Sequence, residues 1–461
     1  MAARSRANRR AVIVCDALRF AADESTPRPT VRLGYAAAMQ IVDDPVELAT
    51  FSEDYGRQGA QPPKLVVKPR DAADVQRAVQ MARDQGLTIR ARSGGHGLEG
   101  QSLNRGGMVV ATADMVLPSG RRIELDRAAN LVRLVPSLRT GEVASFLAPL
   151  GLRLPSSTMD GFPAMGGAVS TAGIGHGSHR HGSLADQVIE LAAVLGTGEH
   201  LRVQSSRRDR ADFGDHDIAH FMLGGLGQAG VITELAFPVV PITGTLRYFC
   251  QVHPSAGAMA QALQAQLDAS DPDTAAVWGT VVKSPSADQL VYLTNCVRDV
   301  RDPSAGEPVV SAGDPGADPE VLPAWLDLIY PSLPHAMRAL EAHPELLTNL
   351  LQIPGVVLVI PQRKVCPDRL TLNAWPRSQP GDMMLALGVF YYLGRAQASA
   401  MVQALRATRD DAIANLGAQP YFMDGLPHDW RPLLGDDRLT RVRAVLDRAD
   451  PHRVFARLPG L

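Results

Sequence analysis

His96 is the residue in this sequence whose surroundings most need a chemical explanation. It stands among glycines in RSGGHGLEGQ, residues 92–101. Glycine clusters occur where the backbone takes unusual dihedral angles, or where another group must approach it closely. An imidazole in such a place can be a metal ligand, a proton carrier, an attachment point or an accident. Because packing there requires no imidazole, we expect His96 to contact or covalently hold a large flat cofactor.

A second candidate site is HGSHRH, which places His176, His179 and His181 within one short segment. The HxxH spacing can grip a metal ion, but carboxylate or cysteine partners at familiar spacing are missing nearby. We therefore favour surface or backbone-bonding histidines and predict no metal site.

Two further motifs carry chemistry only in the right structural context. Gly225, Gly227 and Gly230 have GxGxxG spacing, but the strand-like VITELAF follows them where a dinucleotide fingerprint needs a helix. We expect these glycines to admit a flat ligand or to make a tight turn into a strand. Asp160, in LPSSTMDGFPAMGG, is by residue type alone a solvated turn residue.

Composition limits the classes of function. A chain of 461 residues predicts two domains, and a net charge of −2 gives no reason to expect nucleic acid or an acidic membrane surface as a partner. Apolar runs such as VVLVI are too short to span a bilayer. The basic N-terminus has only the short apolar run AVIVC, so we interpret residues 1–45 as a loosely attached leader of a cytoplasmic protein. The four scattered cysteines predict buried thiols and no disulfide framework.

The elements that must position these residues alternate from residue 63 onward. Four segments are predicted to be strands: KLVVKP, LTIRAR, GMVVAT and NLVRLVPS. DAADVQRAVQMARDQG reads as a helix with an acidic N-cap and a final glycine, and RTGEVASFLAPLG as a helix capped by Thr140 and ended by Gly151. LADQVIELAAVLGTGEHLRV is helical or strand-like up to its GTGE turn, and RLTRVRAVLDRAD is an amphipathic helix. The glycine loop of His96 therefore follows a strand, where ligands commonly bind in α/β proteins.

Taken together, these stretches resemble the FAD-binding fold of the vanillyl-alcohol oxidase superfamily. RSGGHGLEGQ is similar to that family's RxxGHxxxGQ loop, and GGAVSTAGIGHGSHRHG and GGLGQAGVIT are similar to its cytokinin dehydrogenase branch. The resemblance is strong over residues 54–240. It implies an α+β chain with a two-subdomain PCMH-type FAD-binding domain (46–242), an α+β substrate or cap domain (243–424) and a C-terminal segment (425–461) that returns to the first domain.

The resemblance also implies the cofactor and its contacts. FAD would be carried covalently through the 8α-methyl of its isoalloxazine by His96, and Asp160 in STMDG would be the catalytic base. A second covalent bond is not expected. Berberine-bridge-type relatives with doubly linked FAD have a cysteine near this position, where the present chain has Asp160. The cofactor-binding residues carried over from the family are Ser93, Gly94, Gly95, His96, Gly97, Gln101, Asp160, Met165, Gly166, Ser170, Thr171, Gly173, Ile174, Gly230 and Ile232.

The substrate is less closely defined than the cofactor. The chain ends ARLPGL without the family's terminal PGQ, and its HPWLN motif is reduced to DRLTLN. The leading hypothesis is an FAD-dependent oxidoreductase that removes a hydride beside an amine or hydroxyl of a small molecule, with an N6-alkyl adenine as the specific substrate. The alternative is a tailoring oxidase of specialised metabolism acting on an alcohol, sugar, alkaloid or polyketide. A third hypothesis is a non-redox ligand-binding shell, and the oligomeric state stays open.

Overall fold

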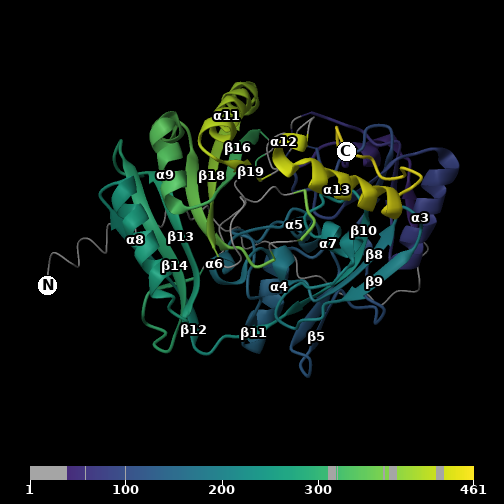
Figure 1. Cartoon of the computed structure of the whole chain (residues 1–461), viewed down its shortest axis with the longest axis horizontal. Helices are drawn as coiled ribbons and strands as arrows, with labels where there is room; N and C mark the ends of the chain where they lie inside the picture. Colours follow the sequence, from purple (N-terminus) through teal and green to yellow (C-terminus); the bar gives the residue numbers. More distant parts are fainter. Residues whose placement is uncertain are drawn as a thin grey trace.

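The computed structural model describes residues 39–57, 59–98, 100–309, 318, 320–366, 369–372, 382–421 and 430–461. Two halves lie side by side, each around its own buried core (Figure 1). Helices and strands are mixed in both halves, so the predicted α+β class is confirmed. Of the expected leader, residues 1–38 lie outside the described residues. Its last part is already structured, because β1 (Gln40–Val42) pairs with β2 (Leu65–Lys68).

The first half contains two larger sheets and a short antiparallel pair, β7 (Leu152–Arg153) with β11 (Val240–Pro241). The first sheet has the order β1-β2-β4-β3, in which β4 (Met108–Ala111) runs parallel to both β2 and β3 (Ile89–Arg92). The second is antiparallel, with the order β5-β6-β10-β8-β9. Its strands are β5 (Ile123–Asp126), β6 (Leu131–Leu134), β10 (Gly230–Pro238), β8 (Glu190–Leu195) and β9 (His200–Gln204). The His96 loop leaves the end of β3, as predicted.

Helix α3 (Ala72–Gln85) connects β2 to β3 and follows the sequence signals closely. The Asp71 carboxylate accepts a hydrogen bond from the Asp74 N–H at 2.9 Å, an N-cap that typically stabilises a helix by about 1 kcal/mol. Gly86 ends the helix in the left-handed region, at φ +63°, which glycine adopts without strain. The face with Val75 and Val79 is buried in the core.

Two predictions about local structure are settled by tertiary contacts. Helix α4 (Thr140–Leu147) has Arg139 as its N-cap, so the prediction that Thr140 caps it is wrong. The Thr140 hydroxyl instead contacts the loop that carries Asp160. The ambiguous segment before the GTGE turn is strand β8, which forms a hairpin with β9, because its apolar residues are buried within the sheet.

The second half is one antiparallel sheet with the order β15-β12-β14-β13-β17-β18-β16-β19. Its strands are β15 (Glu307–Pro308), β12 (Thr245–His253), β14 (Leu290–Val300), β13 (Thr274–Lys283), β17 (Gly355–Arg363), β18 (Met383–Gly394), β16 (Val321–Tyr330) and β19 (Gln419–Pro420). Helices α8 (Ala256–Ala269), α9 (Leu333–Ala342) and α11 (Arg395–Asn415) lie along one face of this sheet (Figure 1). The opposite face is turned toward the first half.

The C-terminal segment packs against the first half (Figure 1). Leu439, Val442 and Leu446 of helix α13 (Asp436–Ala449) are buried at helical spacing and belong to the core of the first half. Beyond the helix, the Ile89 N–H donates to the Val454 carbonyl at 2.6 Å, so the chain end lies beside β3. This contact supports the strand from which the His96 loop emerges.

Three of the four cysteines lie among the described residues. Cys250, Cys296 and Cys366 are free thiols, and each is half-buried where the sequence predicted buried thiols. Burial raises the pKa of the Cys366 thiol to about 12, which leaves it protonated near neutral pH. Cys15 lies outside the described residues. None of the helices described here is both long enough and apolar enough to cross a bilayer.

Candidate active site

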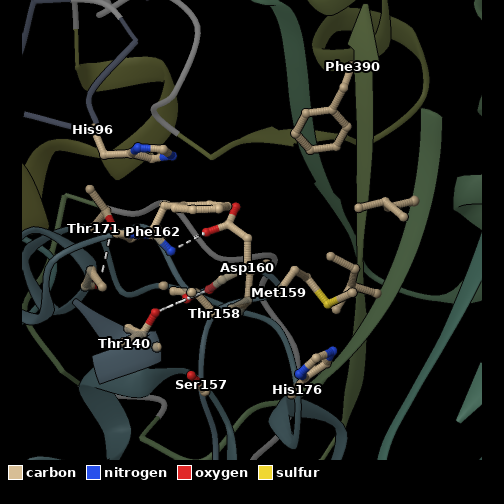
Figure 2. A pocket seen from close by; sticks show the side chains of 18 of the residues that line it. His96, Thr140, Ser157, Thr158, Met159, Asp160, Phe162, Thr171, His176 and Phe390 are labelled. Carbon is tan, nitrogen blue, oxygen red and sulfur yellow. Dashed lines mark hydrogen bonds between the residues drawn. The ribbon is translucent and has the colours of Figure 1, made fainter. Parts of the chain in front are cut away.

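A large cavity lies between the two halves. It measures about 1640 Å³ and is lined by the glycine-rich loops of the first half and by the facing side of the eight-stranded sheet. Ligand pockets commonly measure about 300–1,000 Å³, so this cavity has room for a cofactor and a second molecule. Figure 2 shows His96, Phe162 and Asp160 on one side of the open space and Phe390 across it.

The His96 loop, residues 93–98, is held from behind by the segment that contains Tyr55. The N–H groups of Tyr55 and Gly56 donate to the carbonyls of Gly95 and Gly97, each at 3.0 Å. The Tyr55 ring stacks on the imidazole of His96, with ring centroids 4.1 Å apart. These contacts hold the imidazole at the cavity surface, which it helps to line.

Two glycines near this loop are required by packing of the chain against itself. A Cβ at Gly56 would stand 2.0 Å from the Leu98 carbonyl oxygen, and one at Gly166 would stand 2.7 Å from Pro136 Cβ. Gly167 and Gly227 are different, because a Cβ at either would meet nothing within 4 Å although both line the cavity. Their bare backbone is therefore open to a ligand.

The donors at this end of the cavity suit a phosphate-containing group. Within the described ranges, no protein oxygen accepts from the backbone N–H of Gly94, Gly95 or Gly97. Successive unpaired N–H groups at a strand end form an anion-binding concavity. An extended cofactor with a diphosphate and a flat ring therefore fits the residues present.

Asp160 is held by a loop, residues 157–162, that is tied to helix α4. The hydroxyls of Thr158 and Thr140 donate to the Asp160 carbonyl at 2.6 and 3.1 Å, and the Phe162 N–H donates to the Asp160 carboxylate at 3.1 Å. This is an Asx turn, so the side chain bonds within its own loop as predicted for a turn residue. The carboxylate nevertheless lies at the cavity surface, on the same side as His96 (Figure 2).

Most of the other sequence-predicted residues meet at this cavity. The structure places the following along its surface: Ser93, Gly94, Gly95, Gly97, Gln101, Gly166, Ser170, Thr171, Gly173, Ile174, Gly230 and Ile232. Met165 is the exception, because its side chain is fully buried in the core of the first half. Met165 is the first residue of helix α5 (Met165–Ser170). Its side chain anchors that helix in the core and does not reach the cavity.

The histidines of HGSHRH are not surface residues, so that part of the prediction is wrong. His176 lines the cavity and packs against Trp278, with ring centroids 5.1 Å apart. Burial lowers its pKa to about 4, so it is neutral near pH 7. The pKa values of His179 and His181 are also lowered to about 4, by burial first and by nearby arginines second. No cluster of three or more metal-ligating side chains occurs in the part of the chain described.

The GxGxxG segment turns into a strand, as predicted. β10 begins at Gly230, and Gly227 stands in the left-handed region at φ +70° with its backbone facing the cavity. The pairing of β10 with β8 shifts between Ile232 and Glu234, which is a β-bulge. Bulges redirect neighbouring side chains, and this one lies beside the cavity-lining Ile232.

The sequence analysis missed the facing wall of the cavity. Alternate residues of four neighbouring strands form it, while the residues between them pack against the covering helices. This wall is made by Trp278, Thr280 and Val282 of β13, Val356, Leu358 and Ile360 of β17, Ala386 and Phe390 of β18, and Trp325 and Asp327 of β16. Both faces of these strands are apolar, so alternation gives no clue to which face lines a cavity. Asp327, a carboxylate within the run VLPAWLDLIY, is a signal that could have been used.

The reduced DRLTLN motif joins the two halves. Asp368 and Asn373 lie outside the described residues. Arg369 forms a buried ion pair with Asp186, in which N and O are 2.6 Å apart and the side chains are 2% and 5% exposed. The Thr371 hydroxyl donates to the Gly224 carbonyl at 2.8 Å. The segment therefore fixes the connection between β17 and β18 to the glycine-rich segment of the first half.

Breaking this ion pair should destabilise the protein strongly. In Arg369→Met the carboxylate of Asp186 stays buried without its cation, and we expect the free energy of unfolding to fall by about 3–5 kcal/mol. Urea denaturation measures this loss. The control is Arg207→Ala, which removes an exposed pair with Asp209 in the same half, where we expect less than about 1 kcal/mol. Equal losses in both variants would contradict this role of Arg369.

Part of the glycine-rich half is similar in sequence to a known protein family. Residues 63–204 match the family described as FAD binding domain. Cytokinin dehydrogenase 1 of Oryza sativa subsp. japonica is 31% identical over 241 residues, which cover 52% of this chain and 44% of that protein. Cytokinin dehydrogenase 2 of Arabidopsis thaliana is 31% identical over 201 residues, covering 42% and 37%. The chain thus spans less than half the length of these curated relatives.

Solved structures share the fold over nearly the whole chain. 6-Hydroxy-D-nicotine oxidase from Arthrobacter nicotinovorans superposes with a TM-score of 0.66 at 18% identity, covering 92% of this chain and 98% of that one. BBE-like 1 of Physcomitrella patens superposes with a TM-score of 0.67 at 14% identity, covering 91% and 96%. At these identities the likeness establishes the fold alone.

Proposed function

From an FAD-binding domain at residues 63–204 in a fold of the vanillyl-alcohol oxidase type, we propose that this protein is an FAD-dependent oxidoreductase. It acts on a carbon next to an amine or hydroxyl group of a small molecule. The observation that carries the proposal is the cavity, which has bare backbone and unpaired N–H groups on one side and an apolar wall on the other.

The first half supplies the proposed cofactor site. Backbone N–H groups of Gly94, Gly95 and Gly97 would bind the diphosphate, and Gly167 and Gly227 leave space against which a flat ring can lie. Other residues of this proposed site are His96, Ser93, Gln101, Ser170, Thr171, Gly173, Ile174, Gly230 and Ile232, which line the cavity. Met165 and Gly166 would support the site through packing. When bound, FAD supplies the two-electron acceptor.

His96 is the proposed covalent attachment residue, through the 8α-methyl group of the isoalloxazine. Its imidazole lies at the cavity surface with the Tyr55 ring stacked behind it. Stacking fixes the ring plane, and a fixed ring presents its nitrogen in one direction. These contacts support the tether, and acid precipitation of the protein tests it.

Asp160 is the proposed catalytic base. Its carboxylate lies at the cavity surface, and its loop is fixed by the hydroxyls of Thr140 and Thr158. It would accept the proton from the substrate N–H or O–H while the adjacent carbon is oxidised, so that a neutral imine or carbonyl is released. The apolar wall opposite would exclude water from that proton transfer.

The leading substrate is an N6-alkyl adenine, since the curated relatives similar to part of this chain are named cytokinin dehydrogenases. One observation favours the second candidate, a tailoring oxidase of specialised metabolism. The residues that form the substrate wall follow residue 277 and therefore lie outside residues 63–204, which match the FAD binding domain. The free state of the described thiols is compatible with a reducing compartment and supports the proposed cytoplasmic location.

The purified protein should be yellow, and its flavin absorbance should bleach on anaerobic addition of the right substrate. We expect N6-isopentenyladenine to bleach it. Bleaching by other amines or alcohols, but not by this compound, would identify the tailoring oxidase. A colourless protein that takes up no added FAD would contradict the proposed function and favour the ligand-binding shell.

A further inference from the structure

Asp327 is a carboxyl group buried in the wall that faces the cofactor side of the cavity. Its side chain lines the cavity, and the residue is only 6% exposed. Trp325 shares its face of β16, because residues two apart in a strand point to the same side. Desolvation raises the pKa of Asp327 to about 7, opposed slightly by the indole N–H of Trp325.

The described residues offer this carboxyl group no ordinary partner. Among them, no cation lies within ion-pair distance of Asp327, and the indole N–H of Trp325 beside it lowers its pKa but makes no hydrogen bond of normal geometry. The nearby Tyr421 hydroxyl donates instead to the Ala172 carbonyl, at 3.2 Å. Buried carboxyl groups without a partner are costly, so one that faces a cavity calls for a ligand that satisfies it.

The neighbouring strand leaves room for the group. Gly388 of β18 is paired with Asp327, and Phe390 is paired with Trp325. A Cβ at Gly388 would stand 2.5 Å from Asp327 Oδ1 and 2.7 Å from Phe390 Cε2. Glycine at this register therefore allows the carboxyl group and the aromatic ring to lie side by side.

The surroundings of the carboxyl group are aromatic. The rings of Trp325 and Phe390 are in contact, with centroids 4.2 Å apart, and Trp278 lines the same wall. Flat apolar surfaces of this kind bind planar rings. An ammonium ion brings three donors that all need acceptors, whereas this part of the wall presents one carboxyl group. A planar ring with a single N–H fits better.

We propose that Asp327 determines substrate specificity by accepting a hydrogen bond from a ring N–H of a planar nitrogen heteroaromatic substrate held against Trp325 and Phe390. This inference rests on the proposed function, because it takes the cavity to be the substrate site. A buried acceptor left unpaired rejects an analogue that lacks the donor. Hydrogen bonds to charged groups correspond to about 10- to 100-fold in affinity.

The test compares the binding of two probes to the purified holoprotein. 2-Quinolone has a ring N–H, and 1-methyl-2-quinolone lacks it at nearly the same shape. We expect the wild type to bind 2-quinolone at least about 10-fold more tightly, as measured by calorimetry. Asp327→Leu should abolish that preference while changing the affinity for the methylated probe by less than about 2-fold, within the range of a lost apolar contact. Asp327→Asn should keep part of the preference.

The control variant is Glu307→Gln, which alters an exposed carboxylate lining the same cavity and should leave both affinities unchanged. Asp327→Leu removes a buried charge and should fold, since such replacements are often neutral or stabilising. No preference in the wild type, or a preference that survives Asp327→Leu, overturns the proposal. Failure of the proposed function shows separately, as a protein without flavin or without reduction by any substrate.

Discussion

Replacing Asp160 with Asn is expected to slow the anaerobic reduction of the bound flavin by substrate about 100- to 10,000-fold, which is the usual contribution of a general base. The amide oxygen of Asn can still accept the hydrogen bond from the Phe162 N–H, so the loop should keep its shape. Asn cannot accept the substrate proton. Stopped-flow absorbance measures the rate, and the flavin content of the variant should equal that of the wild type.

The matched control for this substitution is Asp212→Asn. Asp212 also accepts a hydrogen bond from the N–H two residues ahead, that of Gly214, but it lies in an exposed loop outside the cavity. The flavin bound to Asp212→Asn should be reduced by substrate at the wild-type rate. If the flavin of Asp160→Asn is also reduced at that rate, and the variant has its full flavin content, Asp160 is not the base. Another group in the cavity then accepts the proton.

The second large effect is expected from His96→Ala. Acid precipitation of the wild-type protein should leave the flavin with the denatured chain, because a bond between carbon and imidazole nitrogen survives unfolding. The variant should release its flavin completely into the supernatant. Absorbance of pellet and supernatant, with mass spectrometry of the intact chain, measures the attached fraction.

His176→Gln is the matched control for the tether. His176 lines the same cavity but packs against Trp278, away from the glycine-rich loop. Its variant should keep the flavin with the chain. Complete release of flavin from the wild type would contradict the tether, and His96 would then be a wall residue that contacts the cofactor without a bond.

The contacts around Asp160 connect these experiments to the fold. Thr140 begins helix α4, and its hydroxyl lies 2.9 Å from that of Thr158 and 3.1 Å from the Asp160 carbonyl oxygen. The loop of Asp160, the proposed base, is therefore held by a helix from the same half that carries His96. Asp327, in contrast, belongs to the sheet across the cavity. Relative movement of the halves would change the distance between the two carboxyl groups, and the buried pair of Arg369 with Asp186 resists such movement.

The sequence by itself determined many of the local elements and the loops that line the first-half side of the cavity. Helix α3 begins at an acidic cap and ends at Gly86, as the residue types require. The glycine loop of His96 and the loop of Asp160 both line the cavity. These features follow from rules that act over a few residues: side-chain caps, glycine dihedral angles, and hydrophobic periodicity. A loop that binds a cofactor through its own backbone keeps its whole signal within one short stretch.

Only the tertiary structure decided which residues face those loops. The wall with Trp278, Asp327 and Phe390 comes from strands β13, β16 and β18, which follow one another at long intervals in the chain and meet through the order β13-β17-β18-β16. It likewise decided that the Thr140 hydroxyl binds the Asp160 loop and that Met165 turns into the core. Strand order and the choice between two apolar faces depend on which surfaces are buried when distant segments pack together. The free energy of this burial arises only when the whole core assembles, so it cannot be predicted from any short stretch of residues.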